Sequence, residues 1–183
     1  MLDAKEEELI RRLKRGDRNA LRDVYEQHSE YLLALAFSLL HEKSLAEDVL
    51  HDVFVKFAAR AVKLRLRVSL KNYLRACVVS RIRDLHRRRK IRTRKPASSI
   101  SDCIAPSTQA EFDELSQCID SAMARLPYEQ REVIVLHVQE NMSLTDKGLM
   151  LDISPNTVKS RYQRGIKKLQ VWLEHSPRSQ ESA

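Results

Sequence analysis

The chain has 183 residues, enough for one medium domain or two small ones, and only three glycines and a 5% aromatic share. No stretch alternates apolar and polar residues over a useful strand length, and no apolar run approaches the roughly 18 residues of a membrane helix. The acidic, amphipathic N-terminus is unlike a signal peptide. We therefore expect an all-α, cytoplasmic protein.

The net charge of +8 is distributed unevenly along the chain. Residues 60–95 contain fifteen Lys or Arg and one acid, Asp84, a net charge of +14, whereas the remainder has 18 basic and 24 acidic residues. Such polarisation is typical of a nucleic-acid contact within an otherwise acidic protein. A polybasic membrane patch is the alternative, but no lipidation motif accompanies it.

Residues 1–94 predict a compact bundle of four helices. Apolar residues keep helical period over residues 4–15, 20–41, 44–61 and 69–90. At the start of the third helix, Ser44 and Glu47 have the spacing of a capping box, which makes Ser44 the expected N-cap. The expected buried side of the fourth helix consists of Leu70, Tyr73, Leu74, Cys77, Val78, Ile82 and Leu85.

The composition changes after the fourth helix. Residues 95–110 are rich in proline and serine and have no sustained period, which predicts a flexible linker. Residues 111–174 then predict a second helical domain, and the polar tail 175–183 is expected to be disordered. The expected helices of this second domain are residues 112–126, 128–139, 143–151 and 154–173.

The last of these helices has two distinct faces. Ser154 is a suitable N-cap and Pro155 suits the first helical position. An apolar stripe consists of Val158, Tyr162, Ile166, Leu169 and Leu173. The opposite face carries Asn156, Lys159, Ser160, Gln163, Arg164 and Lys167, residue types that bond base edges and phosphates. This pattern indicates the second helix of a helix-turn-helix, and an amphipathic surface helix with solvated cations is the alternative.

The cysteines and the acidic residues offer no catalytic or metal set. Cys77, Cys103 and Cys118 are odd in number and lack a CxxC pair, so a disulfide framework is improbable and a zinc site weakly supported. We find no paired carboxylates with metal spacing, no phosphate-binding glycine loop and no Ser/His/Asp set. A nuclease or nucleotidyl transferase is therefore disfavoured, and we expect a protein that is not an enzyme and needs no cofactor.

Two segments resemble domains of bacterial RNA polymerase sigma factors. LPYEQREVIVLHVQENMSLTDKGLMLDISPNTVKSRYQRGIKKL (126–169) resembles the domain that binds the promoter −35 element, with TVKSR (157–161) in register. AEDVLHDVFVKF (46–57) and YLRACVVSRIRDLHRRRK (73–90) resemble helices of the −10-binding domain. Two such domains joined by a short linker are similar to the extracytoplasmic-function group. The resemblance implies core RNA polymerase and promoter DNA, duplex and single-stranded, as partners, and allows an anti-sigma factor.

The resemblance also implies roles for individual residues of the first domain. Polymerase binding falls to the outward face of the third helix, at Asp48, Asp52 and Lys56, supported by Phe54 and Phe57, although plain core packing is favoured for both phenylalanines. In the fourth helix, Ser80 and Asp84 are expected to read bases of the −10 element. The cations expected on its phosphates are Arg81, Arg83, Arg87 and Arg88.

At the −35 element, the resemblance places the DNA-binding residues on the last helix. Lys159 and Arg164 are expected on phosphates, and Arg161 is expected to reach back over the backbone. The residues expected nearer base edges are Asn156, Ser160 and Gln163, and Thr157 is also expected among the DNA-binding residues.

The chain departs from the family pattern at three places. Asp146, Lys147 and Gly148 replace the usual Glu-Ile-Ala, so that a lysine takes an apolar core position and a glycine weakens the helix by roughly 1 kcal/mol. Asp152 occupies the position of the usual turn glycine or asparagine, which aspartate is expected to tolerate, and Ser80 stands where asparagine is common. Two alternatives stay open: a sigma-like protein that does not initiate, and a LuxR-like activator, which accounts for residues 126–170 but leaves AEDVLHDVF unexplained.

Overall fold

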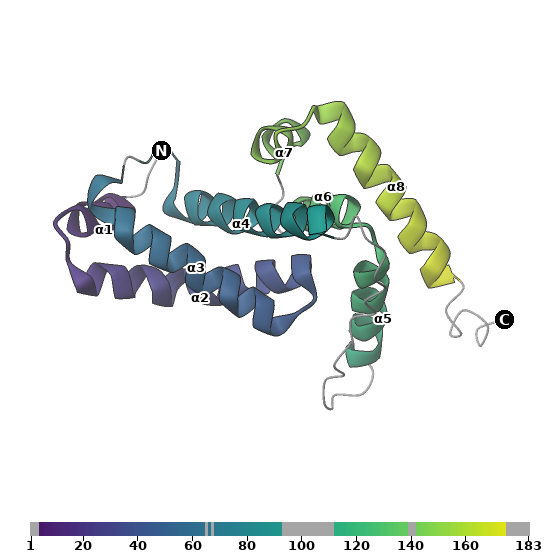
Figure 1. The fold of residues 1–183 in the computed structure, drawn as a ribbon, viewed down its shortest axis with the longest axis horizontal. Helices are drawn as coiled ribbons and strands as arrows, with labels where there is room; N and C mark the ends of the chain where they lie inside the picture. The colour runs from purple at the N-terminus through teal and green to yellow at the C-terminus, as the bar shows by residue number, and fades with distance from the viewer. Residues whose placement is uncertain (1–3, 65, 67, 93–111, 139–141, 175–183) are drawn as a thin grey trace. The chain divides into compact units, whose positions relative to one another are not determined.

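The computed structural model describes residues 4–64, 66, 68–92, 112–138 and 142–174, and every regular element in them is a helix (Figure 1). The chain divides into two compact units, Met1–Arg94 and Lys95–Ala183. The expected all-α class and the helix-turn-helix of the second unit are confirmed. The expected linker at 95–110 and tail at 175–183 lie outside the described residues. None of the described helices is both long and apolar enough to cross a bilayer.

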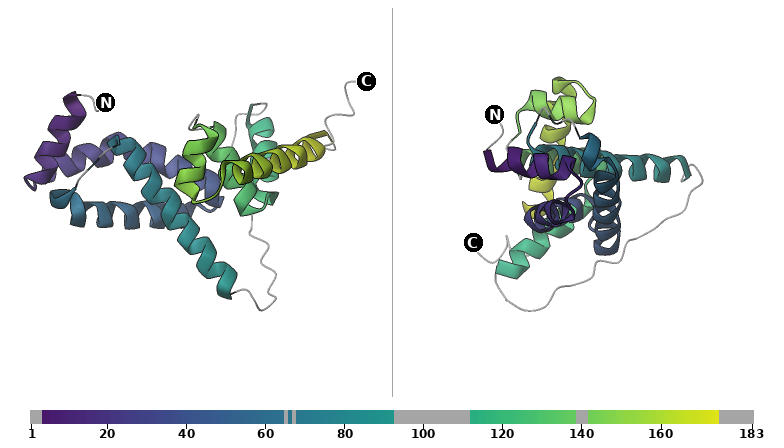
Figure 2. Two further views of the ribbon diagram at one scale, coloured as in Figure 1. Left: turned by 90° about the horizontal axis from the view of Figure 1, so that it is seen from above. Right: turned by 90° about the vertical axis from the view of Figure 1, so that its left-hand side faces the viewer.

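The first unit contains four α-helices and one short 3₁₀ turn. They are α1 (Ala4–Lys14), α2 (Arg18–Leu40), α3 (Lys43–Arg60), η1 (Ala61–Lys63) and α4 (Leu70–Arg92). Helix α2 packs along both α3 and α4, and α3 also packs on α4 (Figures 1 and 2). The core between them is made of apolar side chains almost without exposure: Val24, Leu32, Leu35, Leu39, Val49, Val53, Phe57, Leu74, Val78 and Ile82.

The expected buried side of α4 is confirmed only in part. Leu70, Leu74, Val78 and Ile82 are buried, whereas Tyr73, Cys77 and Leu85 are half-buried. Val79 and Arg75 are also buried, with Arg75 only 7% exposed. Because α2 and α3 both pack on α4, its buried surface is wider than a single stripe.

Polar side chains hold the starts of helices α2 and α4. Asp17 caps α2 by accepting from the Asn19 amide at 2.8 Å, and Arg12 of α1 bonds both Asp17 and Asp23. The hydrogen bond from Arg12, followed by that from the Asn19 amide, lowers the pKa of Asp17. At the start of α4, a carboxylate oxygen of Glu6 accepts from the Leu70 amide. Helix α1 is thereby fastened to both longer helices.

The prediction that Ser44 caps α3 is wrong. Helix α3 begins at Lys43, and Glu42 occupies the cap position without a side-chain hydrogen bond. His41 ends α2 in the left-handed conformation, with φ at 52°, so the chain reverses direction within a short turn and α3 starts two residues earlier than the capping spacing suggests. Ser44 therefore lies inside the first turn.

The second unit contains α5 (Phe112–Arg125), α6 (Tyr128–Val138), α7 (Leu144–Leu151) and α8 (Pro155–Glu174). Helix α8 packs against the three others (Figure 2). The predicted cap at Ser154 is confirmed, since its Oγ accepts from the Thr157 amide at 3.1 Å. Ser143 caps α7 in the same way, accepting from the Asp146 amide at 3.0 Å. The buried apolar residues of this unit include Leu126, Val133, Leu136, Leu151 and Val158.

The turn between α7 and α8 depends on Gly148 and Asp152. Asp152 has φ 51°, in the left-handed region that aspartate tolerates, as the sequence predicts. The carbonyl of Gly148 accepts from the amides of both Asp152 and Ile153. A Cβ on Gly148 would lie 2.8 Å from the Ile153 carbonyl oxygen. From the sequence, Gly148 is expected only to weaken the helix. In the structure it also makes room for this turn, so low helix propensity describes only part of its effect.

Candidate nucleic-acid interface

Helix α8 presents the polar face that the sequence predicts. Asn156, Lys159, Gln163 and Arg164 are exposed, while Ser160 and Arg161 are half-buried. Thr157 is also half-buried, and its hydroxyl lies 2.9 Å from Ser154 Oγ, so this side chain belongs to the cap of the helix. The face is compatible with a major groove.

The opposite face of α8 rests on α6 at Gly165. A Cβ at this position would lie 2.6 Å from Ile134 Cδ1 and 3.3 Å from Gln130 Cβ. The two helices therefore approach more closely than larger side chains would permit. Sequence reasoning missed this contact, because a glycine in a helix gives no signal of which neighbour it faces.

Lys147 lies in the core between the helices of the second unit, without solvent exposure. Its Nζ is 2.7 Å from Nδ1 of His137 on α6, and the His137 ring meets the Tyr162 ring of α8 edge to face at 4.5 Å between centroids. Burial lowers the pKa of Lys147. The sequence predicts the core position of Lys147, but it does not single out His137, which lies ten residues earlier.

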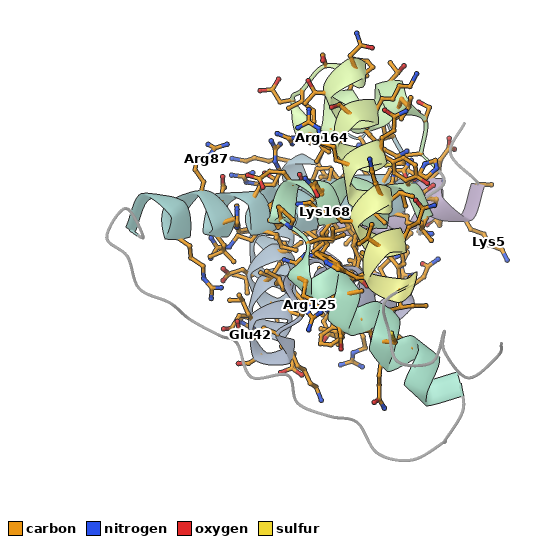
Figure 3. The ribbon with its side chains drawn as sticks, turned by 90° about the vertical axis from the view of Figure 1, so that its right-hand side faces the viewer. Lys5, Glu42, Arg87, Arg125, Arg164 and Lys168 are labelled. Carbon is orange, nitrogen blue, oxygen red and sulfur yellow. The ribbon has the colours of Figure 1, made fainter. Side chains whose placement is uncertain are left out.

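The basic end of α4 is a second cationic surface. Arg87 and Arg88 are exposed, and Figure 3 shows the Arg87 side chain extending away from the helix. Arg83 is half-buried. Buried Arg75 does not contribute to this surface. The remaining cations of the basic stretch at positions 65, 67, 94 and 95 lie outside the described residues.

Helices α3 and α4 line a solvent-open cavity of about 310 Å³. Ser80 and Asp84, expected to read bases, share its wall with Lys56, expected to bind polymerase. The other lining residues are Val53, Phe57, Arg60, Tyr73, Ala76, Cys77 and Arg81. The cavity therefore combines an apolar floor, one carboxylate and three cations.

Two predicted site residues on this surface bind each other. The Asp52 Oδ2 atom accepts from Arg81 Nε at 2.9 Å and from Arg81 Nη2 at 2.5 Å. The family resemblance assigns Asp52 to polymerase binding and Arg81 to a phosphate contact. In the structure they form an ion pair that ties α3 to α4.

The other residues predicted to bind polymerase fall into two groups, one exposed on the surface and one buried in the core. Asp48 and Lys56 are exposed on α3. Phe54 is only 8% exposed and Phe57 only 2%, and the Phe54 ring packs edge to face on Tyr25 at 4.8 Å. Both phenylalanines belong to the core, the interpretation that the sequence favours, so a contribution of Phe54 to binding would be indirect.

The described residues contain no cluster of three His, Cys, Asp or Glu side chains placed to hold a metal ion. Cys77 is half-buried beside Tyr73, and burial raises the pKa of its thiol. The Cys118 thiol is half-buried, and Cys103 lies outside the described residues.

Comparison with known proteins identifies both units. Residues 24–92 match the model of Sigma-70 region 2, and residues 116–169 match that of Sigma-70, region 4. The chain is 24% identical over 181 residues to the ECF RNA polymerase sigma factor SigW of Bacillus subtilis, covering 90% of this chain and 94% of the relative. It is 28% identical over 154 residues to SigM of Mycobacterium tuberculosis, covering 84% and 77%.

The fold is similar to that of a solved sigma factor, RpoE of Bartonella quintana in complex with the anti-sigma factor NepR. The TM-score is 0.69 at 24% identity, over 85% of this chain and 97% of the other. Both matched regions lie in one chain, each in its own unit. The chain therefore belongs to the sigma-70 family of RNA polymerase sigma factors, in its extracytoplasmic-function group.

Proposed function

We propose that the chain binds core RNA polymerase through the outward face of α3, reads duplex DNA at the −35 element with α8, and opens the −10 element with α4. The family directs transcription initiation at promoters. The observation that carries the assignment is the presence, in one chain, of a capped helix-turn-helix with an exposed polar face and a separate cationic helix.

The −35 assignment is supported by the shape of the second unit. Helix α7 ends at the left-handed Asp152, and α8 begins two residues after Ile153, as a helix-turn-helix requires. Asn156 and Gln163 are exposed one or two turns apart on the same face, at positions from which amides can reach base edges. Exposed Lys159 and Arg164 supply phosphate contacts beside them.

The −10 assignment is supported by the cavity and the cations of the first unit. Unstacking a base costs a few kcal/mol, which a pocket and contacts to the backbone must offset. Ser80 and Asp84 at the α3–α4 cavity offer polar groups for such a base, and Arg87 and Arg88 lie exposed two turns further along. Tyr73 is half-buried against Phe57, so we assign opening to pocket and charge rather than to a row of aromatic wedges.

The direct test is run-off transcription with purified chain and core polymerase on genomic DNA, followed by mapping of the 5′ ends. We expect core-dependent starts that share two upstream elements. A chain that binds duplex DNA by itself and gives no core-dependent starts would be a LuxR-like activator. A chain that binds core and gives no starts would be a sigma-like regulator, and either result would overturn the proposal.

The polymerase contact can be tested at Asp48, which is exposed on α3. Asp48→Lys should abolish core-dependent transcription and core binding while leaving the unfolding temperature unchanged, and Glu26→Lys on exposed α2 surface is the matched charge-reversal control. Asp52 needs a different design, because its reversal also breaks the bond to Arg81. The double exchange Asp52→Arg with Arg81→Asp keeps an ion pair and still inverts the charge offered to polymerase.

An anti-sigma factor is a further partner that we propose for this chain. The solved relative RpoE is described in complex with the anti-sigma factor NepR. Co-purification of the tagged chain from uninduced cells of its source would recover such a protein without core polymerase.

A further inference from the structure

The second unit contains a lysine that the proposed function does not use. Lys147 has no exposed surface, although it lies only a few residues from the turn that leads into α8. A fully buried lysine is rare unless a carboxylate pairs with it. Here the partner of Nζ is an imidazole nitrogen, Nδ1 of His137, at 2.7 Å.

The bond between these two side chains depends on their protonation. An ammonium group donates to a neutral imidazole nitrogen, whereas a protonated imidazole carries N–H on both nitrogens and has no lone pair to accept. With both groups protonated, two positive charges would stand 2.7 Å apart in a site that is buried at Lys147 and half-buried at His137. The pair is therefore stable when one of the two side chains is protonated but not when both are.

Few other charges at this junction can compensate. On α7 itself, the Asp146 carboxylate is exposed and accepts from Ser143 Oγ at 2.6 Å. On α6, the buried Glu132 accepts from the hydroxyl of Tyr128 at 2.8 Å. From α8, the facing titratable group is Tyr162, which meets the His137 ring. Among the hydrogen bonds of the described residues, Lys147 Nζ takes part in the one with His137 Nδ1.

The pair also connects the helices of the DNA-reading unit. His137 belongs to α6, Lys147 to α7 and Tyr162 to α8, where Tyr162 lies between Arg161 and the exposed Gln163. We propose that Lys147 and His137 act together as positioning residues for α8 and loosen it when His137 takes a proton at acid pH. This proposal rests on the function proposed above, because a loosened α8 affects −35 reading only if α8 binds that element.

The direction of the pH effect follows from proton binding. Burial lowers the pKa of Lys147, so the unfolded chain binds this proton more readily than the folded one. A second proton on the pair would put two positive charges 2.7 Å apart in the folded unit, whereas in the unfolded chain water separates and screens them. Stability rises with pH wherever the unfolded state binds more protons, so the second unit should lose stability as the pH falls.

Trp172 gives a direct readout of this unit in the full chain, because it is the single tryptophan and lies half-buried on α8. We would titrate its fluorescence from pH 8 to pH 5 at constant ionic strength. We expect an acid transition that moves at least about one pH unit lower in Lys147→Met, which keeps the stem and removes the charge. The matched control is Lys168→Met, an exposed lysine on α8, which should leave the midpoint unchanged.

His137→Asn keeps an acceptor near the Nδ1 position but cannot titrate, and should lower the transition as Lys147→Met does while retaining the Lys147 bond. Equal midpoints in wild type, Lys147→Met and His137→Asn would overturn the proposal. A Lys147→Met chain that fails to fold would leave His137→Asn to decide it. Promoter binding by holoenzyme at pH 7.5 and 5.5 is read separately: no binding at either pH contradicts the proposed function, whereas the fluorescence midpoints still test the pair.

Discussion

The two units hold the helices that we propose to contact DNA in different ways. In the first unit, α4 is fixed by a broad apolar surface against α2 and α3, with the Asp52–Arg81 ion pair at its edge. In the second unit, α8 is fixed by the close approach of Gly165 to α6, and the α7–α8 turn leading into it by Gly148. Its neighbouring helices also contain the buried Lys147–His137 pair.

This difference predicts how each unit responds to change. Apolar packing is non-directional and degrades gradually as groups are removed. Close backbone contacts and buried polar pairs fail when one methyl group or one proton is added. The second unit should therefore be the more sensitive of the two to a methyl group added at Gly148 or Gly165 and to protonation of its buried polar pair.

The largest effect should come from the core of the first unit. Leu74→Ala removes a fully buried side chain of α4 and should cost about 2–5 kcal/mol of unfolding free energy. Because each unit has its own core, the loss should appear in circular dichroism on urea unfolding but not in the Trp172 transition. A Trp172 transition that shifts by the same amount would show that the units unfold as one.

The next largest effect should come from adding a methyl group in the second unit. Gly148→Ala should cost about 1–3 kcal/mol by overpacking, of which a helix-propensity gain of roughly 1 kcal/mol offsets a part. The contact that suffers is the rigid Ile153 carbonyl. Gly165→Ala should cost less, since its closest contact is the movable end of the Ile134 side chain.

The Trp172 transition in urea measures both glycine variants. Gly148→Ala should lower its midpoint more than Gly165→Ala does. A Gly148→Ala chain more stable than wild type would contradict the close fit of the α7–α8 turn.

A smaller effect is expected at the edge of the first unit. The Asp52–Arg81 pair is partly exposed, with side-chain exposures of 41% and 21%, so it should contribute about 0.2–1 kcal/mol. A double-mutant cycle with Asp52→Asn and Arg81→Gln measures this coupling by thermal unfolding. A coupling well above that range would mean that the pair, and not apolar packing, fixes α4 on α3.

The smallest effect concerns acid and the first unit. The pKa of Asp17 is lowered by its bond from Arg12, so the stability it contributes is present above the pKa of an unfolded aspartate, about 3.9, and is lost as the pH falls through the lower folded value. Asp17→Asn keeps the cap of α2 and should remove this pH dependence in circular dichroism. An acid transition of the first unit that is the same in wild type and Asp17→Asn would contradict this contribution of Asp17.

The sequence predicts the helices and both faces of α8 because these follow from local spacing. Four of seven predicted core residues of α4 are buried, and Ser154 caps α8 as expected. Contacts between distant residues were beyond such reasoning. Asp52 and Arg81 lie 29 positions apart, and nothing in either helix alone indicates that they bond.

The same limit applies to the second unit. The family resemblance places Lys147 in the core, but its bond to His137 depends on how α6 and α7 pack. Gly148 is read from propensity as a weakness, whereas the turn gives it a steric role that only the position of the Ile153 carbonyl reveals. Ser44 fails as a cap because the left-handed His41 shortens the preceding turn.

The division of labour between the units can be measured most directly by mapping transcription starts made by core polymerase with variant chains. Gln163→Ala, on the exposed face of α8, should relax the preferred −35 sequence and leave the −10 sequence unchanged. Ser80→Ala, at the α3–α4 cavity, should do the reverse. Start sites whose two elements are unaffected by both variants, or changed together by either one, would contradict the account.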